Sequence, residues 1–148
     1  MRAAIFRQGD LVVDTIPDPV LAEGQVLVRT RACGICGSDL HAARFPEQFA
    51  ALSRRGGARW NIVADRDVVF GHEFVAEVVH NGPATTGRFA PGTMVTSMPL
   101  TIAGQEVIGL GYNPDMPGAF AEYMPLSERM LLPVPAGMNP DHAALVEP

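Results

Sequence analysis

The sequence predicts one domain built mainly from short β-strands, with a few short helices between them. The chain has 148 residues, which is the size of a single domain and enough to bury a sizeable core. Hydrophobic residues make up 47% of it and charged residues 18%, a composition typical of a globular protein. Its 15 glycines and 13 prolines are spread along the chain and separate short apolar runs, as in domains of many short strands joined by tight turns.

The individual strands are predicted from alternating apolar residues and from the turns between them. Residues 2–7 and 11–19 form two strands joined by the turn "QGD". Residues 24–36 alternate between apolar and polar side chains and form a strand that leads into a cysteine motif. Further strands are expected on both sides of Gly71 in 68–83, at two places in 91–111 and within 119–138.

Short helices are predicted where capping residues precede helix-forming ones. Ser38 or Asp39 is expected to cap a first helical turn, and Pro46 is expected to begin a second helix. A further helix begins near the end of the sequence, with Asn139 as its cap and Pro140 in its first turn.

Composition argues against several kinds of partner. The net charge is −5, whereas nucleic acids and anionic membrane surfaces bind proteins with clustered Lys and Arg. No apolar run is long enough to span a bilayer, and the start "MRAAIFRQGD" lacks the apolar stretch of a signal peptide. We therefore expect a cytoplasmic protein with no nucleic-acid or membrane partner. In that compartment a CxxC pair is typically catalytic or metal-binding rather than a structural disulfide.

Both cysteines lie in "ACGICGSDLH", and this motif admits several interpretations. A thiol redox pair normally opens a helix within a βαβ unit, whereas strands precede the motif here. A structural zinc site needs four protein ligands, and the chain offers no third cysteine and no close pair of histidines. A catalytic zinc site needs only three, which Cys36, His72 and the carboxylates of Glu73 or Glu147 could supply. Cys33 and Cys36 could also be small buried residues without a chemical role.

Five short motifs occur along the chain, and their order resembles that of a known protein family. The motifs are "CGICGSDLH" (33–41), "GHEF" (71–74), "APGTMV" (90–95), "PGAFAEYM" (117–124) and "ALVEP" (144–148). In this order they resemble the N-terminal catalytic part of the zinc-dependent medium-chain alcohol and polyol dehydrogenases, over nearly the whole chain. The resemblance implies a GroES-like β-barrel over residues 1–148, followed in the full protein by a Rossmann NAD(P)-binding domain.

The resemblance also implies a set of metal ligands. Cys36 matches the thiolate ligand of the catalytic zinc, and His72 matches the imidazole ligand. Glu147 stands at the position of the third ligand, and Glu73 matches a neighbouring glutamate that replaces it in some members. We expect Glu73 and Glu147 to share that position, and we expect Gly71 to let the chain turn so that His72 and Glu73 point into the site.

Three further residues match the family's proton-handling groups. Asp39 resembles the carboxylate that orients the histidine ligand, a partner that metal-bound histidines generally need. Ser38 resembles the hydroxyl that takes the proton of the substrate, and His41 resembles the outer end of the relay to solvent. Cys33 has no role in this scheme and is expected to be a buried strand residue.

The implied reaction is oxidation of an alcohol to an aldehyde or ketone by hydride transfer to NAD or NADP. The implied partners are a small alcohol or carbonyl substrate and further copies of the same chain in a homo-oligomer. Because no nucleotide-binding motif occurs in the sequence, we expect it to be part of a longer protein and inactive alone. Two alternatives are a non-enzymatic zinc-binding GroES-like module and a thiol redox protein that uses Cys33 and Cys36.

The sequence departs from the family at two places. Residues 97–118 replace a lobe that carries four cysteines in many relatives, so we expect one catalytic zinc and no structural zinc. That loop is expected to be held by its own apolar residues Leu100, Ile102, Val107, Ile108 and Leu110.

The second departure is an insertion at 44–67 that lengthens the chain between Cys36 and His72. It is expected to contribute a helix near the substrate entrance, with Phe49 and Leu52 on its apolar face. We expect this helix to shape the substrate pocket or a contact between subunits.

Overall fold

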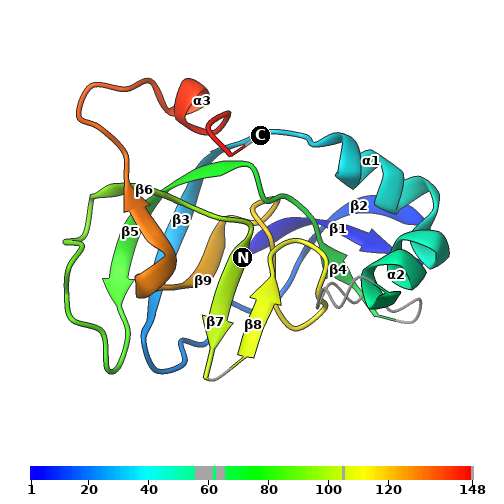
Figure 1. The fold of residues 1–148 in the computed structure, drawn as a ribbon, viewed down its shortest axis with the longest axis horizontal. Helices are drawn as coiled ribbons and strands as arrows, with labels where there is room; N and C mark the ends of the chain where they lie inside the picture. The colour runs from blue at the N-terminus through cyan, green and yellow to red at the C-terminus, as the bar shows by residue number, and fades with distance from the viewer. Residues whose placement is uncertain (56–61, 63–65, 105, 148) are drawn as a thin grey trace.

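The computed structural model describes residues 1–55, 62, 66–104 and 106–147. Within them the fold is mainly β with short helices, as the sequence predicted (Figure 1). The part of the insertion at 56–61 and 63–65 lies outside the described residues. No helix in the described ranges is long and apolar enough to cross a membrane.

The main sheet has five antiparallel strands in the order β10-β6-β5-β3-β9. The centre is formed by β3 and β5, and their inward residues, among them Val26, Val28 and Phe74, are completely buried. This burial follows the predicted alternation in the first of these strands. The five strands are β3 (Gln25–Cys33), β5 (Phe74–Asn81), β6 (Met94–Ser97), β9 (Tyr123–Ser127) and β10 (Leu131–Pro133).

A smaller sheet contains β1 (Arg2–Arg7) between β2 (Asp10–Thr15) and β4 (Val68–Val69). It joins the main sheet through the residues that precede β9. The backbone N–H of Ala4 donates a 2.8 Å hydrogen bond to the carbonyl of Phe120. A β-bridge between Ala3 and Ala121 continues this link, so the two sheets share one edge segment.

The segment at 97–118 contains a β-hairpin. Two strands were predicted in 91–111, whereas the structure has three, because β7 (Leu100–Ala103) and β8 (Glu106–Gly109) follow β6 as a separate pair. Leu110 is fully buried and Ile108 packs against the main core, as expected. The expectation for Val107 was wrong: its side chain is 46% exposed, because side chains alternate along β8 and that of the neighbouring Ile108 is the one that packs against the core.

The helices α1 (Gly37–Arg44) and α2 (Pro46–Arg55) lie at one end of the molecule (Figure 1). Ala42 of α1 and Ala50 of α2 share an apolar cluster with Phe6 and Val68, which places both helices against the small sheet. The predicted helix in the insertion is thus confirmed. Phe49 packs against this cluster, but Leu52 is 59% exposed and does not belong to a buried face.

Helix caps are confirmed in one case and corrected in the other. The cap of α1 is Cys36 rather than Ser38 or Asp39, because Asp39 is the third residue of the helix. The cap of α3 (Pro140–Ala143) is Asn139 as predicted, with Oδ1 accepting a hydrogen bond of 2.8 Å from the backbone of Asp141. A short 3₁₀-helix, η1 (Glu128–Met130), joins β9 to β10.

Candidate metal centre

The adjoining ends of β3 and β5 bring together two distant parts of the sequence. The strands are antiparallel, and Cys33 at the end of β3 lies opposite Phe74 at the start of β5. One more backbone hydrogen bond, 2.7 Å from Gly34 N to Glu73 O, extends the pairing past both strand ends. The residues that follow β3 therefore lie beside those that precede β5, which places Cys36 near His72 and Glu73.

Gly71 makes the turn that precedes His72. Its φ angle is +96°, a conformation that side chains disfavour, and a Cβ there would lie 2.8 Å from the Phe120 nitrogen and 3.0 Å from the Cys33 sulfur. The expectation that a glycine is needed for this turn is confirmed by both observations.

Three side chains form a cluster that could hold a metal ion. The Sγ atom of Cys36, a ring nitrogen of His72 and a carboxylate oxygen of Glu73 lie within 4.8 Å of one another. His72 and Glu73 are each only 6% exposed. Gly34 gives room to Glu73, since a Cβ at that position would collide with the Glu73 carboxylate. In the described part of the chain no other group of three such residues lies close enough to share an ion.

Asp39 stands behind the histidine and ties it to α1. Its Oδ2 atom accepts a 3.0 Å hydrogen bond from the backbone N–H of Cys36, and its Oδ1 atom lies 3.5 Å from Nδ1 of His72. Burial would raise the pKa of Asp39, but its contacts with His72 and Tyr112 outweigh this effect and hold the pKa below its usual value. The side chain is therefore a carboxylate at neutral pH.

The environment of His72 favours the protonated ring as long as no metal is bound. Burial alone would lower the pKa of His72, but the Asp39 carboxylate and the Cys36 side chain outweigh it and raise the pKa to about 9. The Nδ1 atom is buried and makes no hydrogen bond with any described residue, its nearest acid being Asp39. With Nδ1 facing this carboxylate, Nε2 is the nitrogen left for a metal.

Ser38 lies on the Nε2 side of the histidine. Its Oγ atom is 3.4 Å from that nitrogen and 2.8 Å from the hydroxyl oxygen of Tyr112. Tyr112 also donates a 2.8 Å hydrogen bond to Oδ1 of Asp39. Sequence reasoning did not single out Tyr112, because "GLGYNPDMPG" resembles an ordinary glycine-rich loop and lies more than 70 residues away along the chain.

This geometry agrees with comparisons to known proteins. The sequence model of one protein family, the alcohol dehydrogenase GroES-like domain, matches residues 22–136 of this 148-residue chain. The chain belongs to this family.

The relatives of this GroES-like domain are larger proteins. Sorbitol dehydrogenase of Bacillus subtilis is 29% identical over 161 residues, a match that covers 100% of this chain and 42% of that protein. (R,R)-butanediol dehydrogenase of the same organism is 30% identical over 159 residues, covering 100% and 44%. The crystal structure of 2R,3R-butanediol dehydrogenase from B. subtilis superposes with a TM-score of 0.76 at 26% identity, covering 99% of this chain and 44% of that one. The chain therefore spans less than half the length of these relatives.

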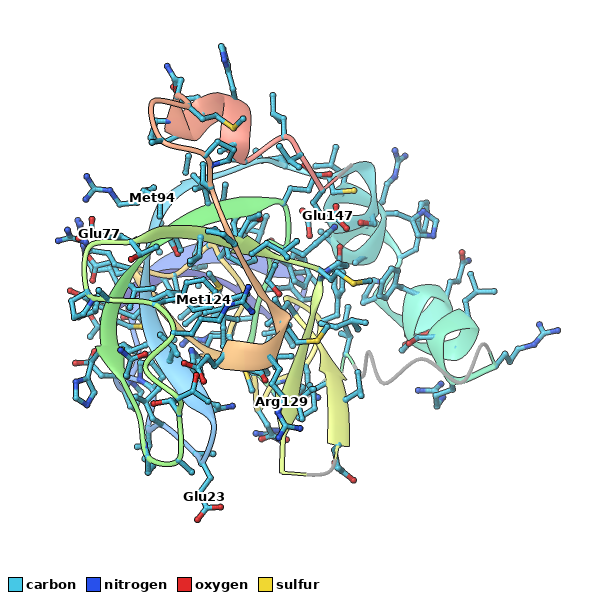
Figure 2. The ribbon with its side chains drawn as sticks, turned by 60° about the vertical axis from the view of Figure 1, so that its left-hand side comes forward. Glu23, Glu77, Met94, Met124, Arg129 and Glu147 are labelled. Carbon is cyan, nitrogen blue, oxygen red and sulfur yellow. The ribbon has the colours of Figure 1, made fainter. Side chains whose placement is uncertain are left out.

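Two of the predicted site residues lie outside the cluster in this GroES-like domain. His41 is exposed on α1, where its ring packs against Phe45 at 5.3 Å between ring centroids, and no side-chain hydrogen bond joins it to a described residue. Glu147 lines a pocket of about 240 Å³ with Met98 and Leu132. In both views the last residues run from α3 toward α1, but the Glu147 carboxylate is not within the 4.8 Å group (Figures 1 and 2).

Cys33 has a different environment from Cys36. It is half-buried at the end of β3, packs against the main core and directs its thiol to the carbonyl of Gly34 at 3.3 Å. Burial, together with the charges of Asp39 and Glu73, raises the pKa of Cys33 to about 12. A redox pair needs an accessible thiolate, so this environment argues against the thiol redox interpretation.

The donor set fits zinc. A sulfur, an imidazole nitrogen and a carboxylate oxygen are three ligand types that zinc accepts, and a site with three protein ligands leaves a fourth position for a substrate. The carboxylate behind the histidine completes the usual surroundings of such a site.

Proposed function

We propose that residues 1–148 form the zinc-binding catalytic domain of an alcohol or polyol dehydrogenase. The enzyme would oxidise a small alcohol to an aldehyde or ketone by hydride transfer to NAD or NADP. The observation that carries this proposal is the cluster of Cys36, His72 and Glu73, backed by Asp39 and flanked by Ser38. The names of the sorbitol and butanediol dehydrogenases support a hydroxylated small molecule as substrate.

Cys36, His72 and Glu73 would hold the zinc. Zinc, when bound, supplies a Lewis acid that polarises the hydroxyl of the substrate. Glu147 belongs to the proposal as an alternative carboxylate ligand, because the last described residues run from α3 toward α1, the helix that Cys36 caps.

The remaining site residues would handle the substrate proton. Ser38 would accept it, since its oxygen lies beside the Nε2 atom of His72. Asp39 would keep His72 in one tautomer and orientation through the contact with Nδ1. His41, exposed on the same helix, would be the solvent end of the relay, with water carrying the proton to it from Ser38.

The nicotinamide cofactor would be bound by a part of the protein outside residues 1–148. The relatives' length, more than twice that of this chain, supports this assignment. A cytoplasmic location and assembly into a homo-oligomer are also part of the proposal. Both cysteines are free thiols, which fits a reducing compartment.

The test is an assay of a protein in which this chain is joined to its nucleotide-binding part. We expect reduction of NAD⁺ or NADP⁺ that depends on a small alcohol or polyol. The activity should disappear after chelation of zinc and in Cys36→Ser, and it should survive in Cys33→Ser. Loss of activity in Cys33→Ser would instead support a thiol redox protein, and zinc binding without any alcohol oxidation would support a non-enzymatic module.

A further inference from the structure

Among the residues that the structure describes, Tyr112 is the largest fully buried side chain, and the scheme above gives it no task. It follows β8 in the chain and is 2% exposed. Its hydroxyl lies 2.8 Å from both Ser38 Oγ and Asp39 Oδ1, and so it bridges two residues of the metal centre. A buried tyrosine hydroxyl usually finds one partner, whereas this one joins two groups of functional interest.

The geometry gives the direction of these hydrogen bonds. The hydroxyl of Tyr112 donates its proton to Oδ1 of Asp39. A tyrosine oxygen that donates can also accept, so Ser38 donates its own proton to it. A lone pair of the Ser38 oxygen is left facing the other side, where His72 Nε2 lies 3.4 Å away.

The ring of Tyr112 is held between the site and the inserted helix. It packs against His72 with 5.4 Å between ring centroids and against Phe70 with 5.5 Å. Phe49 of α2 also contacts the ring, with 4.7 Å between ring centroids. Contacts on several sides leave the ring one position, so its hydroxyl is a fixed point from which Asp39 and Ser38 are oriented.

We propose that Tyr112 is a positioning residue of the metal centre, which holds Asp39 against His72 and turns the Ser38 oxygen toward the metal side of the site. This inference rests on the proposed function, because it assigns Tyr112 to the zinc site described there. Without the hydroxyl, Oδ1 of Asp39 loses a donor and is free to turn from His72, while the Ser38 proton loses its acceptor. Groups that orient a metal-bound histidine typically affect metal affinity by about 10–100-fold.

The first test measures zinc affinity of the chain by competition with a chromophoric chelator. Tyr112→Phe removes one oxygen and keeps the ring, and we expect zinc binding to weaken by about tenfold, the low end for such a group. Tyr123→Phe is the matched control, because Tyr123 is the other tyrosine and its side chain makes no hydrogen bond with a described residue. Its affinity should stay within about twofold of the wild type.

The outcomes separate this inference from the proposed function. If the wild type binds no zinc, the zinc site itself fails. If the wild type binds zinc and a folded Tyr112→Phe binds it equally well, only the positioning role is overturned, even if the variant melts at a lower temperature.

A second test needs no substitution at position 112. If Tyr112 affects zinc binding, zinc binding must in turn affect the surroundings of Tyr112, because coupling between two sites is reciprocal. The difference between the ultraviolet spectra of the zinc-bound and zinc-free wild type should therefore contain a tyrosine signal. The same signal should persist in Tyr123→Phe, which assigns it to Tyr112. If zinc binds but neither the wild type nor Tyr123→Phe gives a tyrosine signal, the proposal is overturned. This test holds even if Tyr112→Phe does not fold, because it does not use that variant.

Discussion

Cys36 and Asp39 hold each other at the start of α1. The Cys36 N–H donates a 3.0 Å hydrogen bond to Oδ2 of Asp39, and the Asp39 N–H donates one of 3.1 Å to the Cys36 carbonyl. One helical turn thus presents a thiol toward His72 and a carboxylate toward the other side of the same ring. Acidic residues are favoured in the first turn of a helix because they accept hydrogen bonds from its backbone N–H groups. In α1 the acidic residue in that turn is Asp39, and the same interaction orients the proposed metal ligands.

Replacing Asp39 should weaken zinc binding more than it weakens the fold. Asp39→Asn keeps an oxygen for the Cys36 N–H but loses the charge that faces His72, so we expect zinc affinity to fall by about 10–100-fold. Competition with a chelator measures this affinity. Asp141→Asn is the control, because Asp141 is an exposed acid in the first turn of α3. Equal affinities of Asp39→Asn and wild type would show that Asp39 does not support a ligand.

Gly71 should tolerate a methyl group far less well than another glycine with positive φ. Gly71→Ala combines an unfavourable φ of +96° with a Cβ 2.6 Å from the Phe120 ring, and we expect it to lower the free energy of unfolding by about 2–4 kcal/mol. Gly87→Ala has a φ of +72° but open space, and should cost about 1 kcal/mol. Urea unfolding measures both, and equal losses would mean that the close approach at Gly71 is unimportant.

The inserted helix α2 should act through Phe49 and not through Leu52. Phe49 packs on Tyr112 and the cluster beneath it, whereas Leu52 is 59% exposed. We expect Phe49→Ala to lower the free energy of unfolding by about 2 kcal/mol, since its ring is only partly buried, and Leu52→Ala to change it by less than about 0.5 kcal/mol. Thermal melting compares them. A larger effect of Leu52→Ala would place the packed face of α2 on the opposite side.

Glu128 should stabilise the fold in a pH-dependent way. Its buried carboxylate accepts hydrogen bonds of 2.7 and 2.9 Å from the backbone N–H groups of Thr86 and Arg88. Burial would raise the pKa of Glu128, but these donors outweigh it and lower the pKa. Glu128→Gln places an NH₂ group against an N–H donor and should cost about 2 kcal/mol at neutral pH.

The sign of the pH effect follows from the lowered pKa. The stabilisation by Glu128 is fully present above the ordinary glutamate pKa and is lost as the pH falls through the lower folded-state value. The difference in unfolding free energy between wild type and Glu128→Gln should therefore shrink on acidification below about pH 4. Glu23→Gln, in an exposed loop, is the control. A difference that stays constant down to low pH would contradict the assignment.

Much of the fold follows from local patterns. The alternation in 24–36 predicted the central strand, and the glycine in "GHEF" predicted the turn that the φ of Gly71 confirms. The number of strands in 91–111 was underestimated, because β8 begins at Glu106, soon after β7 ends at Ala103. The cap of α1 was misplaced, because a cysteine rarely caps a helix and Asp39 looked like the better candidate.

The site was only partly predictable from sequence. Motif order predicted Cys36, His72 and Glu73, and the antiparallel pairing of β3 and β5 explains why they meet. Tyr112 could not be found in this way, because its role depends on where a loop returns in three dimensions. His41 and Glu147 remain predictions, since neither belongs to the group of close ligand atoms.

The most direct test of the account is the zinc content of the purified chain and of two cysteine variants, measured by elemental analysis. We predict about one zinc per chain in the wild type and in Cys33→Ser, and none in Cys36→Ser, because Cys36 is a proposed ligand and Cys33 packs in the core. Both variants replace a cysteine sulfur by oxygen, at positions only three residues apart, so each is a control for the other. Zinc retained in Cys36→Ser, or lost only in Cys33→Ser, would contradict the proposed metal centre.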